Sequence, residues 1–295
     1  MKAHKVVGIG EVLWDLLPAG PQLGGAPANF AYHARALGAD SSVISRIGND
    51  PLGADVLARF HAMGLPVETI QRDDQAETGT VLVVLNPQGL PEYTIKEGVA
   101  WDRLVKTTEA LAVVTAADAV CFGTLAQRTA VSRQTIQHLV ASAGRSSLRV
   151  LDLNLRQHYH STEVIEESLR LANVLKLNED ELTFMGTMFG LKGDTRSQLS
   201  QLAERYSLRL AACTRGGQGS LLLSEGRWSE CAGVPAQVVD TVGAGDAFTA
   251  AMIMGLLAGW SLDDVNLRAN EVAAYVASCA GATPPLPRYL LDRCA

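Results

Sequence analysis

Charged residues, aromatic residues and blocks of one charge sign are all scarce in this 295-residue sequence. Charged residues make up 19% of it and aromatic residues 5%, and its formal net charge is −6. The basic surface that a nucleic-acid backbone requires is therefore not expected. The most apolar stretch, residues 248–260, is shorter than a membrane-spanning helix. Residues 1–5 lead directly into an apolar segment that is too short for the core of a signal peptide.

Cysteine is also scarce, and its pattern argues against two kinds of site. The five cysteines are odd in number, widely separated and without a CxxC pair. Neither a disulfide framework nor a zinc site fits this pattern, whereas reduced thiols do. We therefore expect a cytoplasmic protein with no nucleic-acid or membrane partner.

The sequence does contain an alternation of short apolar runs with amphipathic segments. Strands are predicted at residues 6–12, 42–47, 119–122, 149–153, 174–177, 210–214 and 219–223. Helices are predicted at residues 27–37, 51–63, 132–143, 161–172, 179–185 and 197–206. The alternation predicts an α/β fold in which a mainly parallel sheet is covered by helices and ligands bind at the carboxyl ends of the strands.

Two segments interrupt this alternation. Residues 78–85 and 92–96, joined by a turn at 86–89, have the pattern of a β-hairpin. Residues 14–24 form a second irregular piece, with two prolines and a glycine at its centre. We predict that the two pieces form a small β lid, at about residues 12–24 and 76–101 of a single domain spanning 1–295. A surface hairpin without a gating role is the alternative.

The motif with the clearest chemistry is Gly243-Ala244-Gly245-Asp246. It lies between an apolar, extended stretch at residues 236–239 and an apolar helical stretch at residues 248–257. Small residues at such a junction let backbone N–H groups converge on an anion at a helix N-terminus. Asp246 in the first turn would accept a hydroxyl proton as that oxygen attacks a phosphorus atom. A simple helix cap is the alternative for Asp246.

Other nucleotide-binding motifs do not fit. The segment beginning Gly8-Ile9-Gly10 lacks the third glycine of a dinucleotide fingerprint. Residues 48–53 have the glycine spacing of a Walker A loop, but Ala54-Asp55 stands where Lys and Ser or Thr are required. Protein-kinase signatures are also missing.

Taken together, six segments resemble the PfkB/ribokinase family of carbohydrate kinases, and in particular its bacterial fructokinases. They occur in the family's order along almost the whole chain: Gly24-Gly25-Ala26-Pro27-Ala28-Asn29, residues 48–53, Asp152-Leu153-Asn154-Leu155-Arg156, Asn178-Glu179-Asp180-Glu181, residues 214–219 and residues 240–248. The resemblance implies a ribokinase-like three-layer α/β/α fold with a small β lid. It also implies ATP as the phosphoryl donor.

The resemblance assigns a role to each matching residue. Asp246 matches the catalytic base, and Gly243, Ala244 and Gly245 match the anion hole. The matches on the sugar side are Asp15, Gly25, Asn29 and Arg156. The matches on the nucleotide side are Asn178, Glu181, Thr214, Gly216, Gly219 and Asn270, with Glu181 also organising Mg²⁺ through water.

The resemblance leaves several points open. D-fructose is the preferred substrate, and 2-keto-3-deoxygluconate, ribose and nucleosides are alternatives within the family. An arginine at position 156 would suit a phosphate or a carboxylate, and a surface ion pair is the alternative for it. A potassium site near Asp240 and a homodimer paired through the lid are both compatible with the family. A sugar sensor without catalytic activity is the rival from a different functional class.

Overall fold

The computed structural model describes residues 3–18, 20–85 and 91–291. Its large sheet is mainly parallel, as predicted, and antiparallel pairs occur at one edge, where β12 pairs with β11 and with β13. From edge to edge the strands are β13 (Arg227–Cys231), β12 (Ser220–Ser224), β11 (Leu210–Thr214), β10 (Val174–Asn178), β9 (Leu148–Asp152), β8 (Ala119–Phe122), β1 (Lys5–Ile9), β4 (Asp40–Gly48) and β5 (Ile70–Asp73).

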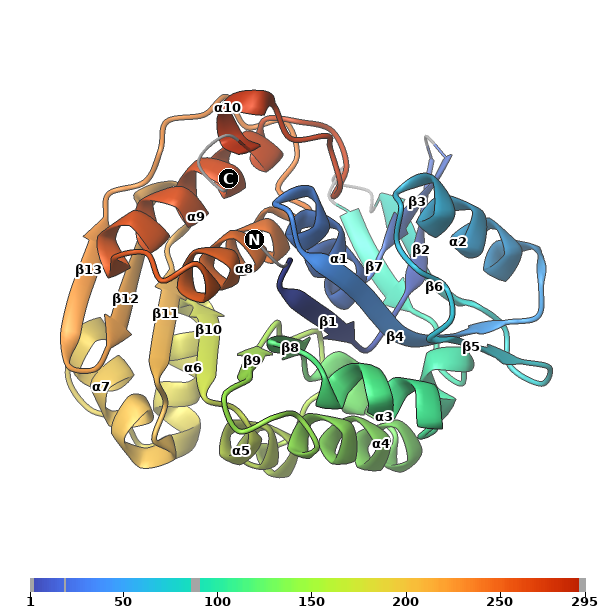
Figure 1. Ribbon diagram of the computed structural model, residues 1–295, viewed down its shortest axis with the longest axis horizontal. Coiled ribbons are helices and arrows are strands. Elements are labelled where there is room, and N and C mark those ends of the chain that lie inside the picture. Colours follow the sequence, from blue (N-terminus) through green and yellow to red (C-terminus); the bar gives the residue numbers. More distant parts are fainter. Residues whose placement is uncertain (1–2, 19, 86–90, 292–295) are drawn as a thin grey trace.

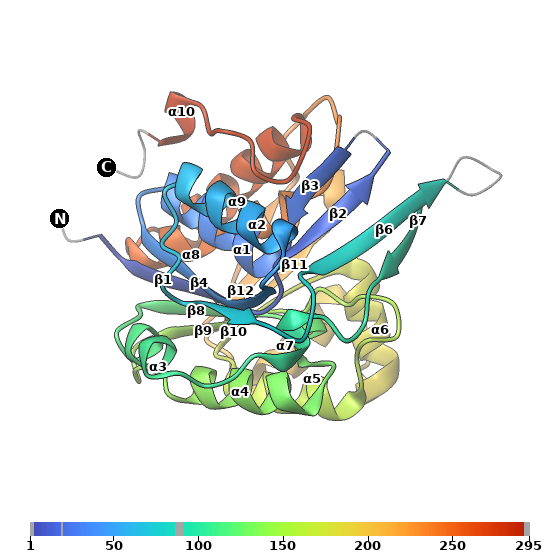
Figure 2. The ribbon, with the colours of Figure 1, turned by 90° about the vertical axis from the view of Figure 1, so that its right-hand side faces the viewer.

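Helices cover both faces of this sheet (Figures 1 and 2). One face packs against α3 (Thr108–Thr115), α4 (Ala130–Ala141), α5 (Thr162–Leu171), α6 (Glu179–Phe189) and α7 (Thr195–Tyr206). The other packs against α1 (Ala26–Ala36), α8 (Ala244–Leu257) and α9 (Leu262–Ala277). Two further helices are α2 (Pro51–Ala62) and the short α10 (Arg288–Leu291). This is the predicted arrangement of a sheet between two helical layers.

A small sheet projects from the body of the protein, as Figure 2 shows. Its strands lie in the order β3 (Gly20–Gly24), β2 (Leu13–Leu17), β6 (Gly79–Leu85) and β7 (Pro91–Ile95). Both irregular pieces of the sequence therefore meet in one sheet, because β2 pairs in parallel with β6. The predicted turn at residues 86–89 lies outside the described residues.

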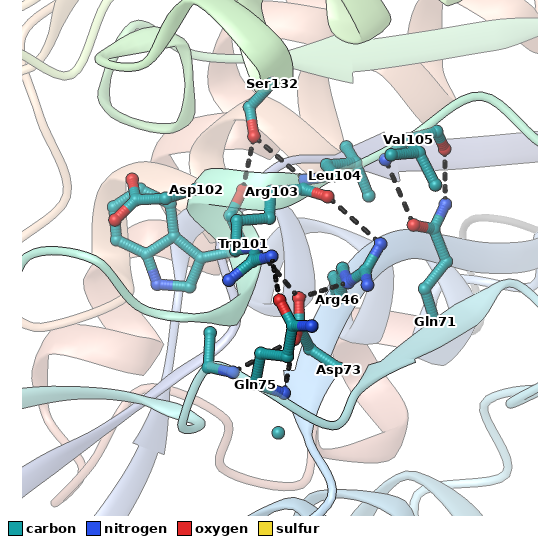
Figure 3. Close-up of polar contacts among 12 residues, drawn as sticks. Arg46, Gln71, Asp73, Gln75, Trp101, Asp102, Arg103, Leu104, Val105 and Ser132 are labelled. Atoms are coloured by element: carbon teal, nitrogen blue, oxygen red, sulfur yellow. Dashed lines mark hydrogen bonds and ion pairs between the residues drawn. The ribbon is translucent and has the colours of Figure 1, made fainter.

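The two segments that lead from the large sheet to the small sheet and back are joined by a polar cluster around Asp73, Arg46 and Arg103, which we call the hinge cluster (Figure 3). Asp73, at the end of β5, accepts hydrogen bonds from the Gln75 and Ala76 N–H groups at 2.8 and 2.9 Å. Its other oxygen lies 2.9 Å from Arg46 Nε and 3.4 Å from Arg103 Nε. The cluster therefore joins β4, β5 and the 3₁₀ turn Ala100–Arg103 that follows β7.

The structure corrects the predicted end of the first strand. The first strand ends at Ile9 rather than at residue 12, because Gly10, with φ 148°, turns the chain toward the small sheet. Residues 236–239 form no strand. Their segment is held instead by the Val239 N–H, which donates to the Ala277 carbonyl at the end of α9 at 2.9 Å. Helix α8 begins at Ala244, so the motif at residues 243–246 lies at its N-terminus, as predicted.

Candidate active site

The motif Gly243-Ala244-Gly245-Asp246 forms the beginning of α8. Gly243 caps the helix with φ 78°, a left-handed conformation that favours glycine. A Cβ at this position would lie 2.4 Å from the Ala282 carbonyl oxygen, so a larger residue would also clash. The first amides of a helix have no intrahelical acceptors and lie at the positive end of the helix dipole. The turn is therefore suited to hold an anion, and Asp246 lies in the first helical turn, as predicted.

The Asp246 carboxylate accepts a hydrogen bond from the Asn29 side chain. The Asn29 Nδ2 group, on α1, donates to Asp246 Oδ2 at 2.8 Å, and Asn29 is 5% exposed. Burial and the neighbouring charge of Asp152 raise the pKa of Asp246 to about 6, against the opposing effects of Asn29, Lys176 and Arg156. A carboxylate with this pKa is mostly ionised at neutral pH, yet it is a better proton acceptor than an exposed aspartate.

Arg156 links the predicted sugar-side residue Asp15 electrostatically to Asp246. Asp15, on β2, has a pKa raised to about 6, chiefly by burial, with Arg156 opposing and Asp240 reinforcing the shift. Arg156 likewise opposes the raised pKa of Asp246, so its charge is felt by both carboxylates. Arg156 is exposed, and within the described ranges it forms no ion pair with a carboxylate. The surface ion pair considered for it is therefore not found there.

Gly25 links these residues to α1. It is the N-cap of α1 with φ 110°, and a Cβ there would lie 2.4 Å from the Glu11 carbonyl oxygen. Only glycine suits both the backbone angle and this close approach. Gly25 therefore allows α1, with Asn29, to begin directly beside the chain that enters β2.

The predicted nucleotide-side residues lie at the carboxyl ends of β10 and β11. Asn178 and Thr214 are register partners on these two strands. Asn178 caps α6 by accepting from the Glu181 N–H at 2.8 Å, and Glu181 accepts from the Asn178 N–H at 2.9 Å. The remaining Glu181 oxygen accepts from the Leu155 N–H at 2.8 Å. This reciprocal capping box fixes Glu181 against the loop that leads to Arg156.

The loop after β11 has the glycine geometry expected of close approach to a ligand or to backbone. Gly216 and Gly219 have φ values of 54° and 85°. A Cβ on Gly219 would lie 2.0 Å from the Cys231 carbonyl oxygen. This contact shows that Gly219 is required for the packing of its own loop, whatever the loop binds.

Asn270 is placed differently from the other predicted residues. Its side-chain NH₂ group donates to Ser220 Oγ at 2.7 Å and to the Asn266 carbonyl at 2.8 Å, and Asn270 is 7% exposed. The first of these bonds holds α9 to β12, and the second lies within α9. Asn270 is therefore part of a buried polar network beneath the candidate nucleotide site.

The one carboxylate predicted to organise a metal ion here, Glu181, suits a cation held mainly by phosphates and water. Among the described residues there is no group of three or more His, Cys, Asp or Glu side chains that could hold a metal ion. Mg²⁺ keeps several waters and needs few protein carboxylates, so Glu181 alone, acting through water, is compatible with it.

Sequence reasoning missed two buried charges at this site. Lys176 lies in the middle of β10, 7% exposed, with Nζ 3.0 Å from Asp152 Oδ1. Glu11 is 3% exposed, and burial raises its pKa to about 7. A signal was present for Lys176, which is the one charged residue in the apolar run 174–177. Glu11 gave a similar signal, because it is the one charged residue in the predicted strand 6–12.

The fold and the site together define an α/β phosphotransferase, with a helix start suited to hold an anion and an adjacent carboxylate of raised pKa. The comparisons make this class specific. The family model described as pfkB family carbohydrate kinase matches residues 21–288. The chain therefore belongs to the pfkB family of carbohydrate kinases, which transfer a phosphoryl group to a sugar hydroxyl.

Individual relatives agree with this assignment. A fructokinase of Escherichia coli is 30% identical over 312 residues, which cover 96% of each chain. The crystal structure of an uncharacterized sugar kinase from Pyrococcus horikoshii is similar with a TM-score of 0.84 at 29% identity, covering 98% of this chain and 97% of the other. The same kinase has also been solved in complex with ATP. A fructokinase from Vibrio cholerae, bound to fructose, ADP and calcium, shares the fold at 23% identity with a TM-score of 0.82.

No helix in the described ranges has both the length and the apolar character needed to cross a membrane.

Proposed function

We propose that this protein is an ATP-dependent fructokinase that converts D-fructose to fructose 6-phosphate, with Asp246 as the general base. The observation that carries the proposal is the Asn29–Asp246 pair, in which a raised-pKa carboxylate lies in the first turn of an anion-binding helix. The relationship to the E. coli fructokinase supports fructose as the substrate.

In the proposed reaction, Asp246 accepts the proton of the sugar hydroxyl while that oxygen attacks the γ-phosphorus of ATP. The N–H groups at the start of α8 bind the transferring phosphoryl oxygens, with Gly243, Ala244 and Gly245 forming the anion hole. Asn29 fixes the orientation of the base. Asp15, Asn29 and the Gly25 backbone bind hydroxyl groups of the neutral sugar, for which acceptors and amides are suitable partners.

We propose that the nucleotide lies over the carboxyl ends of β10 and β11. Thr214, Gly216 and Gly219 would approach its phosphates, and Asn178 and Glu181 would order the water shell of Mg²⁺. When bound, Mg²⁺ supplies positive charge to the phosphates. Asn270 would act indirectly, by holding α9 behind the adenine side of the site.

The small sheet is proposed to be the lid of this single-domain kinase. Asp15 is a sugar-side residue and lies on β2 of this sheet. The loop behind Arg156 is also tied to the small sheet, because Gln157 Nε2 donates to the Tyr93 carbonyl on β7 at 2.6 Å. Movement of the small sheet would therefore move sugar-side groups, which is what a lid requires.

Two further properties are proposed. A potassium ion would bind near Asp240, whose carboxylate accepts from the Gly281 N–H at 3.1 Å and so joins the α8 turn to the loop after α9. Pairing of two copies through the small sheet would cover the exposed Leu82, Val84 and Tyr93 side chains. A comparison of turnover in KCl and NaCl tests the first, and sedimentation of the Leu82→Glu variant tests the second.

A second candidate substrate, 2-keto-3-deoxygluconate, is favoured by Arg156. This exposed guanidinium acts on both Asp15 and Asp246, and it forms no ion pair with a carboxylate in the described residues. A substrate carboxylate would provide one. If this sugar acid is the substrate, Arg156→Gln should raise its KM at least tenfold while leaving the KM for fructose within about threefold.

The deciding experiment is a kcat/KM panel with Mg-ATP, in which ADP release is measured for fructose, 2-keto-3-deoxygluconate, ribose and a nucleoside. The proposal expects fructose to have the highest kcat/KM. A higher value for another sugar would replace the substrate but keep the mechanism. Tight sugar binding without ADP release from any substrate would instead favour a sugar sensor.

A further inference from the structure

The buried side chain of Lys176 lies directly beneath the anion-binding turn. A Cβ built on Gly245 would be 3.1 Å from Lys176 Nζ. Because Gly245 is in the first turn of α8, the ammonium group and the first amides of this helix lie side by side. The absence of a side chain at position 245 is what leaves this approach open.

Lys176 is held in this place by a short chain of hydrogen bonds. Its Nζ donates to Asp152 Oδ1 at 3.0 Å, and both side chains are less than one-tenth exposed. Asp152 Oδ2 accepts from Thr249 Oγ1 at 2.8 Å, and Thr249 belongs to α8 itself. The ammonium therefore has a fixed position relative to the turn, and a preorganised charge needs little reorganisation during a reaction.

The Asp152 pair uses only part of what Lys176 offers. An ammonium group has three N–H donors. In the part of the chain that the structure describes, Asp152 is the hydrogen-bond acceptor recorded for it. Two donors therefore remain for a ligand on the Gly245 side.

The charges around Lys176 explain why a cation is needed there. Burial disfavours the charged ammonium, but Asp152, Glu181 and Asp246 outweigh this effect and raise the Lys176 pKa. The site thus has three acids around one buried cation before any phosphate arrives. The other cation, Arg156, is exposed and acts on Asp15 and Glu11 as well. A transferred phosphoryl group, itself anionic, requires positive charge at the anion turn.

We propose that Lys176 is a further catalytic residue, whose ammonium donates hydrogen bonds to the transferring phosphoryl group at the start of α8, with Asp152 and Thr249 as its positioning residues. This inference rests on the proposed kinase function. In the step, the sugar oxygen bonds to the γ-phosphorus and its proton passes to Asp246. The bond from that phosphorus to the bridging oxygen breaks, and ADP leaves with the electron pair. Lys176 keeps its proton throughout.

The test separates this role from simple neutralisation of Asp152. Lys176→Met leaves Asp152 buried without its partner and is expected to lower stability. The double variant Asp152→Asn/Lys176→Met removes both charges and should recover most of the melting temperature. We expect kcat to remain about 10²- to 10³-fold below wild type in the double variant, while the KM for the sugar stays within about threefold. Lys192→Met, which changes an exposed lysine, is the matched control and should leave kcat unchanged.

A binding measurement gives a second readout. Calorimetry with Mg-ADP alone, and with Mg-ADP, sugar and aluminium fluoride as a mimic of the transferring phosphoryl group, should show that the double variant binds ADP normally but loses the extra affinity for the mimic. A double variant with the kcat of Asp152→Asn alone and full affinity for the mimic would overturn the role of Lys176. Failure of the proposed function would be recognised separately, because wild type would then release no ADP with any sugar.

Discussion

Asp73 in the hinge cluster and Asp246 at the active site are both aspartates placed among charged neighbours, but their environments have opposite effects. Asp73 accepts two backbone hydrogen bonds and lies beside Arg46 and Arg103 (Figure 3). Asp246 accepts one hydrogen bond from a neutral amide and lies near another acid, Asp152. The Asp73 carboxylate is therefore surrounded by N–H groups, whereas the Asp246 carboxylate accepts one hydrogen bond.

The pKa values follow from this difference. Burial tends to raise the pKa of Asp73, but the Gln75 and Ala76 N–H groups and then Arg46 outweigh it and lower that pKa. Burial and Asp152 raise the pKa of Asp246 to about 6. A group that holds structure is most useful when its charge never changes, whereas a general base must be able to take up a proton. Asp73 is therefore suited to a structural role, and Asp246 to the proposed role of base.

The largest expected effect is on catalysis at Asp246. Asp246→Asn keeps the size and the contact with Asn29 but removes the proton acceptor, so we expect kcat to fall about 10³-fold. ATP binding, measured by calorimetry, should stay near normal. A variant that retains more than a tenth of wild-type kcat would show that Asp246 is not the base.

The next largest effect is on stability at the hinge cluster. Asp73→Asn leaves Arg46 without its partner and is expected to lower the free energy of unfolding by about 2 kcal/mol. The kcat of the folded variant should be close to that of wild type. Asp74→Asn, an exposed neighbour, is the control in urea unfolding. Equal losses from the two substitutions would contradict the structural role given to Asp73.

The dependence of the rate on pH tests the proposed role of Asp246 and its contact with Asn29. Because Asp246 must be ionised to act, kcat/KM should fall about tenfold per pH unit below pH 6 and level off above it. Asn29→Ala removes a hydrogen bond to the ionised form, so its inflection should move to higher pH. An inflection that stays in place, or moves lower, would mean that Asn29 does not act through the base.

The smallest effect expected is a stability change of opposite sign at the two aspartates. The pKa of Asp246 is about 6 in the folded protein and near 4 in the unfolded chain, so its ionisation favours the unfolded state. This destabilisation is complete above about pH 6 and absent below about pH 4. Asp246→Asn should therefore stabilise the protein by about 1 kcal/mol at pH 7.5 and have little effect at pH 4. The penalty of Asp73→Asn should shrink on acidification, because a lowered pKa stabilises only above it. Thermal unfolding at both pH values measures the two signs.

Much of the fold could be predicted because its signals are local. Residues 119–122 and 210–214 were predicted as strands at their observed bounds, since buried parallel strands are continuous apolar runs. The two edge strands β5 and β13, Ile70–Asp73 and Arg227–Cys231, were missed, because short strands at an edge are partly exposed and need no such run. The stretch at 236–239 has apolar residues but belongs to no strand.

The family, the layered α/β fold and the helix start at residues 243–246 could all be predicted from the sequence, because each depends on residues that are consecutive or regularly spaced. Tertiary structure decided which charges act on one another. Asn29 and Asp246 are 217 positions apart and share a hydrogen bond, and Lys176 reaches Gly245 only because β10 passes beneath α8. The pKa of Asp246 is likewise set by neighbours from other elements. Burial and electrostatic interaction depend on distance in space, which spacing along the chain does not specify.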